Sequence, residues 1–140
     1  MRKKGKLLLL LGMIFLLAGC GKRPQEERGY TIYYVDAAGT RLAETNYVPS
    51  AENFDELMDE LINELEQPPE AGMVSALQGS VSLNGYERGI DALRIDFSKE
   101  YYDLGNIEEV LLRAAVVKTF SQIPSVTKVM ITVEQEQLCD

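Results

Sequence analysis

Short runs in which apolar and polar residues alternate recur after residue 29, and they predict β-strands. The segment Asp36–Gly39 separates the first two runs, so these two are expected to form a hairpin. The dipeptide Asn84-Gly85, typical of tight turns, follows the third run and predicts a second hairpin, with a longer connection through Tyr86–Gly89 as the alternative. The five predicted strands are Tyr30–Val35, Arg41–Val48, Ser80–Asn84, Ala92–Ser98 and Lys128–Glu134.

The segment from Asn53 to Leu65 has apolar residues at helical spacing. Asn53 is suited to cap the helix, with Glu56 three residues later, and Pro68-Pro69 stops it. The apolar stripe consists of Phe54, Leu57, Met58, Leu61, Ile62 and Leu65. Acidic residues cover the other side, and Asp55, Asp59 and Glu60 are candidates for docking a basic partner. A helix face that is merely solvated has the same pattern.

A second helix is predicted from Asn106 to Ile123 and is ended by Pro124. Its apolar surface is wide, which indicates a helix deep against a sheet or one covered on two sides. The predicted stripe is Ile107, Val110, Leu111, Ala114 and Val117, extended by Leu112, Val116 and Phe120.

The predicted order is β-β-α-β-β-α-β, with residues Glu70–Ser80 as a loop. Mostly alternating strands with two helices favour an α+β fold, in which both helices pack on one face of a mixed sheet. By length, residues 30–140 are expected to form a single domain.

The N-terminus has the pattern of an export signal. Four basic residues between Arg2 and Lys6 precede an uncharged run of 15 residues, Leu7–Gly21, shorter than the ~20 that a membrane-spanning helix needs. Leu17-Ala18-Gly19-Cys20 resembles the lipobox of bacterial lipoproteins, which implies cleavage before Cys20, diacylglycerol on its sulfur and a further acyl chain such as palmitate. An ordinary cleaved signal and an uncleaved anchor with an incidental Cys are the alternatives.

This pattern divides the chain into a signal peptide (1–19), a lipidated Cys with a polar tether (20–29) and the domain. The expected location is the outer face of the cytoplasmic membrane. Residues 20–140 contain 10 basic and 22 acidic residues, a net charge of −12. This charge argues against binding nucleic acid and against lying flat on an anionic membrane surface. Cys139 remains as a single thiol, so no disulfide within the chain is expected.

The sequence contains little catalytic chemistry. It has no His, which removes most zinc sites and His-assisted nucleophiles, and its Gly residues form no phosphate-binding loop. Asp96 with Tyr101 or Tyr102 is the one local cluster of interest, although an ordinary surface turn explains it as well. We therefore predict no catalytic residue, no metal site and no cofactor.

Four segments together resemble the GerMN domain of sporulation and spore germination proteins. They are YTIYYVDAAGTRL, LINELEQPP, ALRIDFSKEYYDL and TFSQIPSVTKV, and they lie between Tyr30 and Val133. The family usually has a Gly-containing turn after its last strand and often a second domain. Here the last predicted strand continues into Glu134–Leu138.

The resemblance implies an envelope lipoprotein of spore-forming Gram-positive bacteria, with a domain similar to the ring-building modules of secretion-like complexes. The implied function is non-catalytic: it assembles or stabilises an envelope complex in sporulation or germination, with proteins of that complex as partners. It leaves homo-oligomerisation open. The alternative is a lipoprotein whose sheet binds a cell-wall fragment or a small solute.

Overall fold

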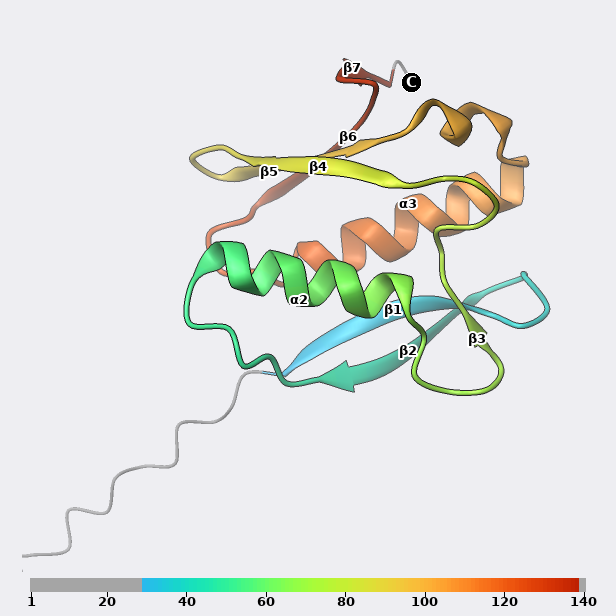
Figure 1. Cartoon of the computed structure of the whole chain (residues 1–140), viewed down its shortest axis with the longest axis horizontal. Coiled ribbons are helices and arrows are strands. Elements are labelled where there is room, and N and C mark those ends of the chain that lie inside the picture. Colours follow the sequence, from blue (N-terminus) through green and yellow to red (C-terminus); the bar gives the residue numbers. More distant parts are fainter. Residues whose placement is uncertain (1–28, 139–140) are drawn as a thin grey trace, which may run out of the picture.

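The computed structural model describes residues 29–138. The predicted signal peptide, Cys20 and nearly all of the tether lie outside the described residues, as does Cys139. The described elements follow the order β1, β2, α2, β3, β4, β5, a 3₁₀ helix, α3, β6 and β7 (Figure 1).

The strands in this part of the chain form two sheets. One sheet has the order β2-β1-β3 and the other β4-β5-β6-β7. All neighbouring strands are antiparallel except β5 and β6, which are parallel because α3 connects them. The strands are β1 (Tyr30–Asp36), β2 (Leu42–Tyr47), β3 (Met73–Val74), β4 (Leu83–Arg88), β5 (Ala92–Phe97), β6 (Lys128–Val133) and β7 (Glu136–Gln137).

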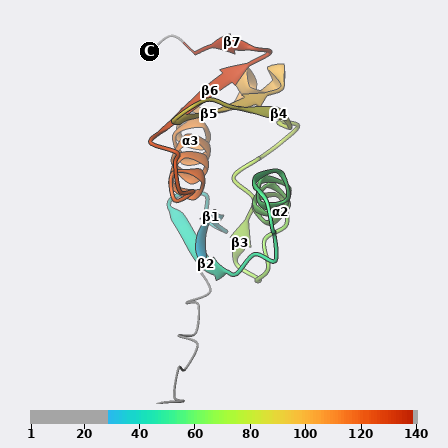
Figure 2. The same cartoon turned by 90° about the vertical axis from the view of Figure 1, so that its left-hand side faces the viewer.

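Helices α2 (Phe54–Glu66) and α3 (Asn106–Phe120) lie in the layer between the two sheets (Figure 2). The α+β class is therefore confirmed, but the strands form two sheets and not the single mixed sheet predicted. One layer of helices buries the apolar inner face of each sheet, because α3 packs against both β1 and β6. The segment predicted as a loop, Glu70–Ser80, contains the two-residue strand β3.

The first predicted helix and its cap are confirmed. The Asn53 side chain accepts a hydrogen bond from the N–H of Glu56 at 3.0 Å, and the Glu56 side chain accepts one from the N–H of Glu52 at 2.9 Å. The first contact satisfies one of the backbone donors that the first turn leaves open, and the second fixes the residue that precedes the cap. The residues buried on α2 are Met58, Leu61 and Leu65, all from the predicted stripe.

The buried face of α3 differs from the prediction. Ile107 and Val110 are each 64% exposed and Val117 is 39% exposed, although all three belong to the predicted stripe. The helix is apolar around much of its circumference, so periodicity does not select the side that β1 and β6 cover. The buried residues are Leu111, Leu112, Ala115, Val116, Thr119 and Phe120.

The second hairpin is present, but the tight turn predicted at Asn84-Gly85 is wrong, and the chain turns at the end of the alternative segment Tyr86–Gly89. Asn84 and Gly85 lie inside β4, and the chain turns after Gly89, whose N–H donates to the carbonyl of Ala92 at 2.7 Å. The Asn84 side chain donates to the Asp96 carboxylate of β5 at 3.1 Å, and the register shifts at Gly85. A contact between distant residues therefore overrides the local turn signal.

Side chains of α3 and the residues after it cover the edge of β1 that faces away from β2. The Gln122 amide donates to the carbonyl of Thr31 at 2.7 Å and accepts from its N–H at 2.9 Å. The buried Thr119 hydroxyl accepts from the N–H of Tyr33 at 3.2 Å. These contacts take the place of a neighbouring strand along the first part of this edge, and β3 pairs with its end at Val35 and Asp36.

Candidate docking surfaces

The acidic residues singled out on α2 have different environments. Asp55 is exposed and accepts a hydrogen bond from the Tyr86 hydroxyl of β4 at 3.1 Å. Burial, and then this hydrogen bond to Asp55, raise the pKa of Tyr86. Asp59 lies one turn later and is exposed. Asp55 and Asp59 therefore share a solvent-facing edge of the helix.

Glu60 is half-buried and is held by the segment between β2 and α2. Its carboxylate accepts from the Tyr47 hydroxyl at 2.8 Å, the Ser50 N–H at 2.9 Å and the Ser50 hydroxyl at 2.7 Å. The Ser50 hydroxyl hydrogen bond is the main cause that holds the pKa of Glu60 below its ordinary value. Glu60 thus has a structural role in addition to any role in docking.

A second polar cluster surrounds Asp96 on the outer face of β5. Its carboxylate accepts from the Thr132 hydroxyl at 2.7 Å and the Gln135 N–H at 2.7 Å, as well as from Asn84. Glu134 and Gln135 form the turn between β6 and β7 with positive φ angles of 51° and 68°. Non-glycine residues pay roughly 1–2 kcal/mol for this conformation, and the bond to Asp96 offsets part of that cost.

These contacts determine what Asp96 does chemically. Burial alone raises the pKa of Asp96, but hydrogen bonds from Thr132, from the N–H of Gln135 and from Asn84 outweigh it and hold the pKa below its ordinary value. A carboxylate stabilised in this way is a poor proton donor near neutral pH. A hollow of about 320 Å³ lies beside it, lined in part by Glu87 and Arg94.

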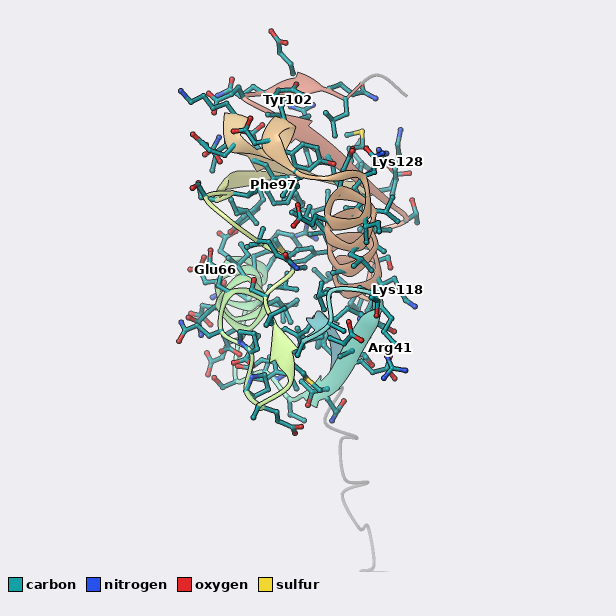
Figure 3. The ribbon with its side chains drawn as sticks, turned by 90° about the vertical axis from the view of Figure 1, so that its right-hand side faces the viewer. Arg41, Glu66, Phe97, Tyr102, Lys118 and Lys128 are labelled. Carbon is teal, nitrogen blue, oxygen red and sulfur yellow. The ribbon has the colours of Figure 1, made fainter. Side chains whose placement is uncertain are left out.

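The structure does not bring Asp96 together with the two tyrosines. Tyr101 is buried and its hydroxyl donates to Glu109 of α3 at 3.1 Å, while Tyr102 is 63% exposed (labelled in Figure 3). The real neighbours of Asp96, Thr132 and Gln135, are more than 35 residues away in the chain, a separation that local spacing does not reveal.

Two further observations apply to residues 29–138. No group of three or more Cys, Asp or Glu side chains there is arranged to hold a metal ion. Neither of the two α-helices in that range has the length and apolar character needed to cross a bilayer.

Comparison with known proteins identifies the family. The family model described as "Germane: Sporulation and spore germination" matches residues 31–139. The chain belongs to this family. Among curated proteins, no match was found.

Solved structures support the Germane fold. The first GerMN domain of the sporulation protein GerM from Bacillus subtilis is 17% identical, with a TM-score of 0.62 over 79% of this chain and 86% of that one. The tandem GerMN domains of the same protein give 18% identity and a TM-score of 0.62, but this chain covers only 40% of their length. A predicted lipoprotein from Clostridium perfringens is 21% identical, with a TM-score of 0.51 over 79% of this chain and 77% of that one.

The segments that resemble the family have structural positions in this Germane domain. ALRIDFSKEYYDL forms β5 and the 3₁₀ helix Lys99–Asp103. Ser98, between them, donates its N–H to the carbonyl of Ser82 at 2.9 Å, and its hydroxyl accepts from the N–H of Ser82 at 3.1 Å. TFSQIPSVTKV contains Thr119 and Gln122, which cover β1.

Proposed function

We propose that this Germane-family protein is a lipid-anchored docking module on the outer face of the cytoplasmic membrane. It assembles or stabilises an envelope protein complex during sporulation or spore germination and catalyses no reaction. The observation that carries the proposal is the match to the sporulation and germination family over residues 31–139.

The environment of the carboxylates supports a docking function. Asp96 and Glu60 are held in their ionised forms by hydrogen bonds that fix a turn and a helix entry. Their positions favour a stable scaffold over proton transfer. The exposed edge of α2 with Asp55 and Asp59 offers a surface for a basic partner, and strands β2 and β4 each have one edge unpaired in residues 29–138.

The proposed anchor places the domain next to its partners. A tether of nine residues after Cys20 spans at most about 30 Å, so the lipid confines the domain near the membrane and raises its effective concentration for a partner there. Two or more acyl chains anchor far more firmly than one, at about 0.8 kcal/mol per buried methylene.

Labelling cells with an alkyne fatty acid tests the anchor. We expect the parent chain and Cys139→Ala to be labelled and Cys20→Ala to remain unlabelled. Labelling of Cys20→Ala at the parent level contradicts the anchor and the location derived from it.

Chemical crosslinking in intact sporulating cells, followed by mass spectrometry, tests docking. We expect crosslinks to envelope proteins, and fewer of them for Cys20→Ala. The alternative is a ligand-binding lipoprotein, for which the hollow beside Asp96 is the candidate site. Capture of no protein, together with a cell-wall fragment bound to the pure protein at micromolar affinity, favours that alternative.

A further inference from the structure

The beginning of β6 has a neighbouring strand on one side only. β5 pairs with β6 along its whole length, whereas β7 pairs only with its last two residues. Glu134 donates its N–H to Phe97 on β5 at 3.0 Å. Because backbone groups alternate in direction along a strand, those of Val129 and Ile131 point to the opposite edge. In the described part of the chain, residues 128–131 therefore form an open strand edge.

A groove of about 280 Å³ runs between this edge and α3. We call it the β6 groove, and its lining includes Arg113, Val117, Lys128, Val129, Ile131 and Leu138. Its lining combines aliphatic side chains with charged and other polar groups, and polar atoms make up the larger part of the exposed lining. The exposed residues Ile107 and Val110 continue the aliphatic part of this lining along α3, since they precede Val117 at helical spacing. These are the same residues that the sequence predicted to be covered.

The charge near the groove is opposite to that of the domain. Residues 29–138 contain 7 basic and 19 acidic residues, yet the charged residues that line the groove are Arg113 and Lys128. Arg113 forms an ion pair with Glu109 on α3 at 3.6 Å. Figure 3 shows Lys118 and Lys128 on the same side of the molecule. The Lys118 ammonium lies 4.6 Å from the centroid of the Tyr33 ring. Lys128 is exposed and forms no ion pair with any residue in the range 29–138.

We propose that the β6 groove binds an extended segment of another protein in which aliphatic residues alternate with Asp or Glu. The segment pairs with the backbone of Val129 and Ile131 and adds a strand to the sheet. Its aliphatic side chains face α3 and contact Val117, and its carboxylates, which point to the opposite face of the sheet, approach Lys128. This inference rests on the proposed docking function and specifies the chemistry of one partner.

Charge selects this occupant over a second copy of the chain. Pairing of two β6 edges about a two-fold axis places the groove with Lys128 and Arg113 against its own copy. The basic residues of the two copies repel each other at this short distance and oppose association. The acidic residues elsewhere on each copy do not offset this repulsion, because charges more than about 8 Å apart are largely screened by salt. β7 also favours an acidic segment as the occupant. This strand contains Glu136 and already pairs with the other end of the same β6 edge.

Fluorescence polarisation with the full chain in detergent micelles tests the proposal. The probes are two labelled nine-residue peptides, one alternating Val and Glu and the other alternating Val and Lys. We expect the Val–Glu peptide to bind and the Val–Lys peptide not to bind. Lys128→Glu weakens binding by about fivefold or more, as expected for reversing one exposed charge contact. Lys99→Glu, which reverses an exposed charge on the 3₁₀ helix, is the matched control and retains binding.

Val129→Pro tests the strand pairing separately. Its missing N–H faces the open edge, so pairing with β5 is kept while the donor to the peptide is lost. Circular dichroism checks that Val129→Pro is folded. If it is not folded, the binding of Lys128→Glu still decides the test. Absence of binding, equal binding of both peptides, or binding unaffected by Lys128→Glu overturns the proposal. Such a failure leaves docking elsewhere intact, because the cell crosslinking does not depend on this groove.

Discussion

The substitution Gln122→Glu tests how the edge of β1 is closed. It keeps the size and shape of the side chain but replaces the amide donor by a carboxylate oxygen. The Gln122 amide nitrogen donates to the carbonyl of Thr31 at 2.7 Å and also to those of Lys118 at 2.9 Å and Thr119 at 3.2 Å. The substitution therefore places a carboxylate oxygen against carbonyl acceptors. One hydrogen bond contributes about 0.5–1.5 kcal/mol, and the repulsion between acceptors adds to its loss. Since Gln122 is exposed and water competes there, we expect about 1–2 kcal/mol of destabilisation at pH 7.

The effect of pH provides the decisive readout. The contact with the Thr31 carbonyl favours the protonated carboxyl, which donates to that oxygen and still accepts from the Thr31 N–H. The pKa of the substituted carboxyl is thus higher in the folded than in the unfolded protein, and the destabilisation disappears as the pH falls through that value. Urea unfolding followed by circular dichroism at pH 7 and pH 4 measures this. Ser121→Asp is the control for a negative charge at the same helix end. Equal stability of Gln122→Glu and the parent at pH 7, or a loss of stability that persists at pH 4, contradicts this role of Gln122 at the edge of β1.

Three further substitutions test the core and the turn. Leu111→Asp introduces an unpaired charge into the core and is expected to abolish the cooperative thermal melt in circular dichroism, whereas Val110→Asp, at an exposed neighbouring position, melts like the parent. Asp96→Asn is expected to lose about 1–2 kcal/mol at pH 7. Because the pKa of Asp96 is lowered in the folded protein, its contribution to stability is present above the ordinary pKa of ~3.9 and is lost as the pH falls. Urea titrations in which Asp96→Asn loses as much stability in acid as the parent contradict this. Tyr34→Phe removes a buried hydroxyl that has no hydrogen-bond partner among the described residues, so its unfolding free energy is expected to equal or exceed that of the parent; a loss above about 1 kcal/mol contradicts this.

Elements whose signals are local were predictable from the sequence. The helix from Phe54 to Glu66 has its stripe, its cap at Asn53 and its stop within one continuous segment. The strands β1, β5 and β6 also agree with their alternating patterns to within about one residue at each end.

Features that depend on distant contacts were not predictable. The alternating pattern of a strand gives its apolar face but not its neighbour, so it did not distinguish two sheets from one. The exposed side of α3 depends on where β1 and β6 lie, and Asn84-Gly85 is kept in a strand by Asp96. Asp55, Asp59 and Glu60 share a helix, but only the fold reveals that Glu60 is bound to Ser50.

The most direct test of docking places a photo-crosslinking amino acid at single surface positions in sporulating cells. Four positions sample the surface: Met130 at the β6 groove, Asp59 on α2, Glu44 on β2 and Glu87 beside the Asp96 hollow. Mass spectrometry then identifies the molecule attached to each. We expect peptides of envelope proteins at one or more of Met130, Asp59 and Glu44. Attachment of cell-wall fragments at Glu87, with no protein at the other three positions, contradicts it.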